Sequence, residues 1–152
     1  MRRNALILCL GFALGMAGTP TLYADQVYTI YPIPQEQIAG VGTVSLSATV
    51  NIVCDTKDRA TEVLKEKGIA ATFSDQAKSG QTNLYLAVSG SKGPADRKAE
   101  DMGIDRAVLS REGKFDRHIV SLSADGTDAR IVILGENTDA VFYGLASLEQ
   151  ML

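Results

Sequence analysis

The sequence predicts an α/β (α+β) fold, a two-layer sandwich in which a mixed or mostly antiparallel sheet carries its helices on one face. Residues 44–54 and 83–89 alternate apolar with polar side chains, the two-residue period of a half-buried strand. Residues 118–123 and 130–134 are two β-rich runs with a turn between them. Residues 141–152 carry apolar side chains in steps of four, three and four, which indicates an amphipathic helix.

The first element after residue 24 is extended. The residues that precede Pro32 and Pro34 are kept out of the α region, and neither proline can donate to a strand ladder. We therefore expect residues 28–34 to form an edge strand or a strap across the surface. The strand at 44–54 follows, and its apolar face consists of Val44, Leu46, Ala48, Val50 and Ile52.

A helix is expected next, because Ala60, Val63 and Leu64 recur at helical spacing and Gly68 can end it. Asp55 or Thr56 is suited to cap its first turn. Residues 69–73 then lead as a short strand into a polar turn. The strand at 83–89 comes after it.

Pro94 is placed for the first turn of a short helix that ends near Met102. We expect residues 104–114 to be a loop. The Asp125-Gly126 pair is a strong hairpin signal between the two β-rich runs. The closing helix has three competent N-caps ahead of it, Asn137, Thr138 and Asp139.

Residues 1–24 have the layout of a secretory signal peptide. Arg2 and Arg3 form a positive start, and residues 5–17 are uncharged and mostly apolar, shorter than the roughly 20 residues of a membrane-spanning helix. The cut is expected near Ala24, with Ala17 as a second candidate. We therefore expect a secreted or periplasmic protein, without membrane attachment after cleavage.

Composition narrows the function classes. Loss of Arg2 and Arg3 with the signal peptide takes the formal charge from −3 to −5. A mildly acidic chain without a basic cluster argues against a nucleic-acid partner. Cys54 is the one cysteine after residue 24, so no intrachain disulfide is expected in the single domain at 25–152.

Two segments resemble a known family. Tyr31-Pro32-Ile33-Pro34-Gln35 resembles the opening of the N-terminal, domain-2-like domain of bacterial β-N-acetylhexosaminidases of glycoside hydrolase families 84 and 20, which include hyaluronidase-like and O-GlcNAcase-like enzymes. The closing run resembles the end of the same domain through Val141, Phe142, Tyr143, Gly144, Leu145, Leu148, Gln150 and Leu152.

The resemblance implies a non-catalytic domain that precedes a catalytic (β/α)₈ barrel, and this chain stops before such a barrel. It therefore implies no catalytic, cofactor-binding or metal-binding residue here. The implied roles are structural. Tyr31, Pro32, Pro34 and Gln35 would strap the sheet. The last helix would be held on the sheet by Phe142, Tyr143, Leu145 and Leu148, with Gly144 permitting close contact.

Other chemistry has weaker support. Cys54 and His118 could form a nucleophile–base pair, but a buried thiol and a strand histidine explain them better. The aspartate pairs 55/58 and 125/128 fit capping and turn roles better than paired-carboxylate catalysis. Residues 135–144 match no phosphate-binding motif. One histidine and one cysteine make a metal centre improbable.

Two functions remain open. The chain is either the accessory domain of a secreted β-N-acetylhexosaminidase, truncated or paired with a separately encoded barrel, or a free-standing extracytoplasmic module that binds a glycan or a protein. The first predicts a contiguous apolar surface left bare without the barrel. We expect no cofactor in either case.

Overall fold

A computed structural model describes residues 20–23, 27–40, 42–55, 60–112, 115–125 and 128–152. None of its helices is long and apolar enough to cross a membrane within those ranges. The elements, in chain order, are β1 (Thr21–Tyr23), β2 (Thr43–Ser45), β3 (Thr49–Cys54), α1 (Ala60–Glu66), β4 (Ala70–Phe73), β5 (Thr82–Val88), α2 (Pro94–Asp101), a 3₁₀ helix (Ala107–Ser110), β6 (His118–Asp125), β7 (Asp128–Gly135) and α3 (Thr138–Met151).

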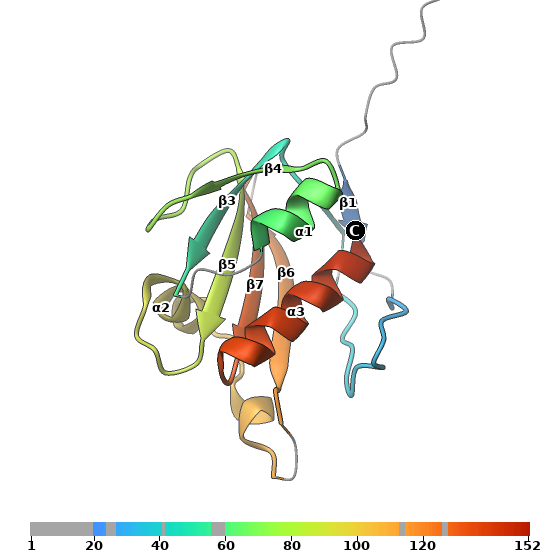
Figure 1. The fold of residues 1–152 in the computed structure, drawn as a ribbon, viewed down its shortest axis with the longest axis vertical. Coiled ribbons are helices and arrows are strands. Elements are labelled where there is room, and N and C mark those ends of the chain that lie inside the picture. Colours follow the sequence, from blue (N-terminus) through green and yellow to red (C-terminus); the bar gives the residue numbers. More distant parts are fainter. Residues whose placement is uncertain (1–19, 24–26, 41, 56–59, 113–114, 126–127) are drawn as a thin grey trace, which may run out of the picture.

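Five of the strands form one mixed sheet in the order β4-β3-β5-β7-β6 (Figure 1). Strand β3 is parallel to both β4 and β5, β5 is parallel to β7, and β6 is antiparallel to β7. The predicted hairpin is confirmed, because Asp125 lies opposite Asp128 at its end. Its tip, including Gly126, lies outside the described residues.

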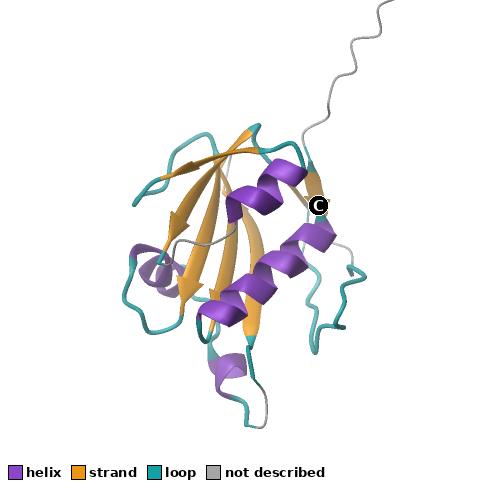
Figure 2. Ribbon diagram, in the orientation of Figure 1, coloured by secondary structure: helices purple, strands orange, loops and turns teal. Residues whose placement is uncertain are grey.

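Helices lie on both faces of this sheet (Figure 2). Helices α1 and α3 cover one face, where Leu64 and Leu148 join the main apolar core with Ile52, Leu84 and Ile131. The predicted mixed α+β sandwich is confirmed by this arrangement. The prediction that all helices share one face is wrong for α2, whose Ala95 and Ala99 pack on the opposite face. Alanine is too small to mark the buried face of a helix clearly in the sequence, so the pattern did not predict which side of the sheet α2 covers.

Strand β5 shows the consequence of this double cover. Six of its seven residues are buried, so both its faces lie in the interior. Leu84 and Leu86 join the core under α1 and α3, and Tyr85 and Ala87 join a second cluster under α2. A central parallel strand buried on both faces is the usual arrangement in a helix-covered sheet.

The strand predicted at 44–54 is divided between two sheets. Val44, Leu46, Val50 and Ile52 are buried, as the alternation requires. Ala48, expected on the same face, is exposed, because the ladder is interrupted between β2 and β3. Side chains replace the backbone pairing there, because Ser47 N–H donates to Thr82 Oγ1 and Thr82 N–H donates to Ser47 Oγ, both at 2.8 Å.

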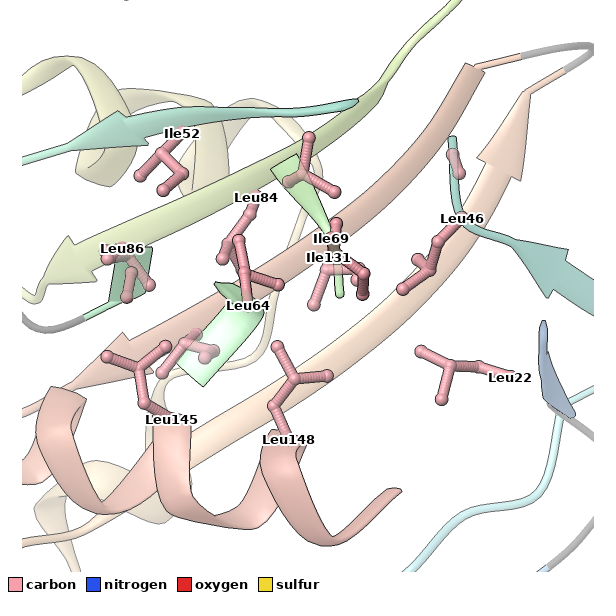
Figure 3. Close-up of a cluster of buried hydrophobic side chains, with 14 of the residues drawn as sticks. Leu22, Leu46, Ile52, Leu64, Ile69, Leu84, Leu86, Ile131, Leu145 and Leu148 are labelled. Atoms are coloured by element: carbon pink, nitrogen blue, oxygen red, sulfur yellow. The ribbon is translucent and has the colours of Figure 1, made fainter. Parts of the chain in front are cut away.

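Strand β1 extends the core beyond the predicted domain boundary. It pairs antiparallel with β2, with Leu22 opposite Val44, and Leu46 N–H donates to the Pro20 carbonyl at 2.8 Å. The Leu22 side chain is 0% exposed, at the β1 end of the main core, where it packs with Leu46 and Leu148 (Figure 3). Residues 20–23 thus lie within the segment predicted as a signal peptide; residues 1–19 and Ala24 lie outside the described part.

Asp55 caps a different helix from the one predicted. Its carboxylate accepts hydrogen bonds from the backbone N–H groups of Ala95 and Asp96, at 3.0 and 3.1 Å, in the first turn of α2. It also accepts from the Ser91 hydroxyl at 2.8 Å. The sequence predicted a cap for α1 because α1 is the next helix along the chain. In the structure β3 ends beside the start of α2, so Asp55 caps that helix. Thr56, the other predicted cap, lies outside the described residues.

Candidate docking surface

Helix α3 has an inner face, which packs on the sheet, and an outer face, which is exposed. The Asn137 side chain caps its start by accepting from Ala140 N–H at 2.8 Å. Leu145 and Leu148 are buried against the sheet. Gly144 lies so near the sheet that a Cβ there would be 2.3 Å from Ile133 Cγ2. The close contact expected at Gly144 is therefore present in the structure.

The outer face of α3 carries two aromatic rings. Phe142 and Tyr143 are 38% and 48% exposed and lie edge to face, with centroids 5.7 Å apart. The resemblance implied that both rings would hold α3 on the sheet. They point outward instead, because the sheet side of the helix is already occupied by Val141, Leu145 and Leu148.

Residues 27–40, which we call the strap, contain no strand or helix. Ile30 is buried, but four other apolar side chains of the strap stand in solvent: Val27, Tyr31, Ile33 and Ile38 are 69%, 69%, 78% and 84% exposed. Pro32 and Gln35 are exposed as well, and Pro34 is half-buried. Of the two forms predicted for this segment, the strap is the one observed.

Side-chain amides hold the strap in place. Tyr31 N–H donates to Gln150 Oε1 at 2.8 Å, and Gln150 Nε2 donates back to the Tyr31 carbonyl at 3.0 Å. Gln37 makes the same pair of bonds with Tyr28, each at 2.9 Å. Each amide thus pairs with one backbone residue as a neighbouring strand would. The strap lies along the C-terminal end of α3 as a result (Figure 1).

The outer face of α3 and the strap together form what we call the docking surface, comprising Tyr31, Ile33, Ile38, Phe142 and Tyr143. Sequence reasoning missed Ile38 and Gln37, and it named Gln150 as part of the closing motif without a role. One sequence feature could have indicated that Ile38 is exposed: it is an apolar residue in a proline-containing segment that lacks the alternation of a strand. The two glutamine anchors depend on contacts between distant segments, for which the sequence offers no local signal.

Two shallow hollows adjoin this surface. One, of about 120 Å³, lies between α1 and α3 and is lined by Glu62, Val63, Glu66, Phe142, Leu145, Ala146 and Glu149. The other, of about 230 Å³, lies within the strap, around Ile30 and Pro34. Both are smaller than the roughly 300 Å³ at which ligand pockets begin. Exposed apolar side chains beside shallow hollows favour contact with a macromolecule over a small molecule.

The structure separates Cys54 from His118. Cys54 ends β3 and His118 begins β6, and two further strands lie between them. At about 4.8 Å per strand, these residues lie too far apart for a nucleophile–base pair. His118 Nε2 is instead 3.1 Å from Ser147 Oγ of α3, and Ser147 Oγ donates to the Tyr143 carbonyl at 3.1 Å. The histidine thus joins a strand to a helix.

The other candidates have structural explanations. Asp128 accepts from Gly80 N–H at 2.7 Å, which fastens the loop before β5 to the hairpin. Asp58, the proposed partner of Asp55, lies outside the described residues. Gly135 is required by space, because a Cβ there would be 2.7 Å from Val141 N. Within the described ranges, no three side chains of metal-binding type gather in one place.

Comparison with known proteins agrees with the fold. The sequence profile described as "Glycosyl hydrolase family 20, domain 2" matches residues 27–152. This chain belongs to the domain 2 family of family 20 glycosyl hydrolases. The resemblance noted from the two motifs is confirmed, and the match spans both of them.

A solved structure shares the domain 2 fold. CpGH84D, a family 84 glycoside hydrolase, is 32% identical to this chain, with a TM-score of 0.69 over 83% of it. The match covers 22% of the CpGH84D chain, so this chain spans less than a quarter of that protein's length. No curated protein matches the sequence. The findings support an accessory domain of a glycoside hydrolase.

Proposed function

We propose that this domain 2 is the non-catalytic accessory domain of an exported β-N-acetylhexosaminidase, an enzyme that hydrolyses β-linked N-acetylglucosaminides. Its partner is the catalytic (β/α)₈ barrel, in the same chain or encoded separately. The domain packs on the barrel through the docking surface and stabilises or positions it. The chain by itself is inactive on glycosides.

The observation that carries this proposal is the exposure of Tyr31 and Ile33 in the strap and of Tyr143 on α3. Apolar side chains left in water forgo about 25 cal/mol for each Å² that a partner would cover. Contiguous exposed apolar surface, when it occurs, marks an interaction site. The family match supports a hydrolase as the partner, since its members are domains of glycosyl hydrolases.

A free-standing module that binds a glycan or a protein is the alternative. The exposed rings of Phe142 and Tyr143 favour it to the extent that aromatic rings stack on sugars. Against it, the hollow beside Phe142 is shallow and is bordered by Glu62, Glu66 and Glu149. Glycan binding by the isolated chain, measured by calorimetry with N-acetylglucosamine oligomers, separates the two functions.

The direct test is assembly with a hydrolase that lacks this domain. CpGH84D with its matching segment deleted is co-expressed with this chain, and the mixture is passed over a sizing column. We expect a one-to-one complex and recovery of hydrolysis of 4-nitrophenyl N-acetyl-β-D-glucosaminide. Ile33→Asp should abolish the complex, whereas Phe73→Asp on the edge strand β4, the matched control, should not.

A chain that stays monomeric and soluble beside the deleted hydrolase would contradict the proposal. Assembly that survives Ile33→Asp combined with Tyr143→Asp would leave the partner correct but the surface wrong. Equal loss with Phe73→Asp would mean that the variants act by unfolding the domain, which circular dichroism of each variant detects.

A further inference from the structure

We propose that the exported protein is cut after Ala17 and not after Ala24, so that β1 remains part of the mature domain. This inference rests on the export proposed above. It differs from the boundary expected from sequence, which places the cut near Ala24 and discards residues 20–23. The difference decides whether the mature domain keeps one strand and one core leucine.

The first argument is the core. Leu22 is 0% exposed and packs with Val44, Leu46 and Leu148. Replacing a buried leucine by alanine in a well-packed core lowers the folding constant by about a hundredfold or more. A cut after Ala24 removes the whole leucine together with β1, and it uncovers the edge of β2.

The second argument is the strap. The Tyr28 hydroxyl accepts a hydrogen bond from Tyr23 N–H of β1 at 2.6 Å, and Tyr28 is also the residue that Gln37 holds. A cut after Ala24 deletes this donor. The strap would then lose one of its attachments, and the docking surface depends on the strap.

The third argument is the chemistry of the cut. Signal peptidases prefer small residues at the last position and two residues before it. Ala17 has Gly15 in that place, whereas Ala24 has the large Leu22. At Ala17, water adds across the Ala17–Gly18 peptide bond: the Ala17 carbonyl carbon receives the hydroxyl and Gly18 nitrogen receives the proton. The secretory signal peptidase of the host supplies the catalyst.

The test is the mass of the exported protein. The full chain is expressed in a bacterial host with a secretory pathway, and the intact mass and first residues of the periplasmic or culture-fluid product are determined. We expect a chain that begins at Gly18. Ala17→Leu should block processing or move it, whereas Ala24→Leu, the matched control, should leave the start at Gly18.

A product that begins at Asp25 would overturn this inference and leave export intact. A product that keeps Met1 and stays in the cytoplasm would overturn export itself, so the two failures are distinguishable. A second measurement is independent of export: chains expressed from Gly18 and from Asp25 are unfolded in urea. We expect a folding constant at least about a hundredfold lower for the second, and equal values would contradict the inference.

Discussion

Tyr31 and Gln150 are separated by 119 positions in sequence and are joined by two hydrogen bonds, of 2.8 and 3.0 Å. Each residue belongs to one of the two motifs that resemble the hexosaminidase domain. The contact therefore joins the two motifs in space, because the glutamine of the second motif fixes the backbone of the first. It also sets where Ile33 and Ile38 stand relative to α3.

Gln150→Ala should release this part of the strap. Two solvent-accessible hydrogen bonds are lost, so we expect the free energy of unfolding to fall by about 1 kcal/mol. The amide of Tyr31 should exchange with deuterium faster. Gln35→Ala, at an exposed position in the same strap, should change neither quantity. Unchanged exchange at Tyr31 in Gln150→Ala would mean that the amide contact does not hold the strap.

Gly144→Ala should destabilise the domain, although the same change stabilises most helices by about 1 kcal/mol. The new Cβ would overlap Ile133 Cγ2 and would lie 3.3 Å from His118 Cδ2, so α3 must move away from the sheet. We expect a loss of about 1–3 kcal/mol, measured by urea unfolding. A gain in stability would show that α3 does not approach the sheet as closely as described.

Asp55→Ala should loosen α2. The carboxylate serves Ala95 and Asp96 N–H in the first turn and the Ser91 hydroxyl beside it, so we expect a loss of about 2 kcal/mol. Hydrogen exchange at Ala95 should rise most. Asp101→Ala, at the exposed far end of the same helix, is the control and should stay within about 0.5 kcal/mol.

The stability of the domain should depend on His118 below neutral pH. Burial lowers the pKa of His118 from its usual 6.5, and the Asp116 carbonyl opposes this only in part. The unfolded chain therefore takes up the proton first as the pH falls. We expect the free energy of unfolding to decrease from about pH 7 through 6.5 and to level off below the folded-state pKa of His118.

His118→Gln is the variant that isolates this effect, because an amide can still reach Ser147 but does not titrate. Its stability should be flat over the same pH range. Losses at lower pH belong to carboxylates: hydrogen bonds from Arg117 lower the pKa of Glu136, which is ion-paired with that arginine. A slope near pH 6 that persists in His118→Gln would assign the titration to another group.

Local patterns predicted the parts of the fold that local chemistry determines. The apolar steps at Val141, Leu145 and Leu148 predicted α3 and its buried face, and Asp125-Gly126 predicted the hairpin. The helix at 94–101 was also found from Pro94, but its side of the sheet was not. Helix α2 packs on the sheet through alanines, which are also common in exposed polar helices. The face of the sheet that it covers therefore depends on the rest of the chain.

The candidate surface was harder to predict because it is made of residues that do not pack. The family resemblance implied that Phe142 and Tyr143 hold α3 on the sheet, but both are exposed because Val141, Leu145 and Leu148 already occupy the sheet side of the helix. Leu22 shows the opposite error. An apolar residue beside a signal-like segment reads as part of it, and its burial depends on the pairing of β1 with β2.

The most direct test of the accessory-domain function is the sequence of the gene and its transcript beyond the codon for Leu152. We predict that a catalytic barrel with adjacent acidic residues follows, in frame, after a single frame interruption, or in a neighbouring reading frame that is transcribed with it. A stop codon with no glycoside hydrolase barrel encoded nearby would contradict that function and would leave a free-standing binding module as the better explanation.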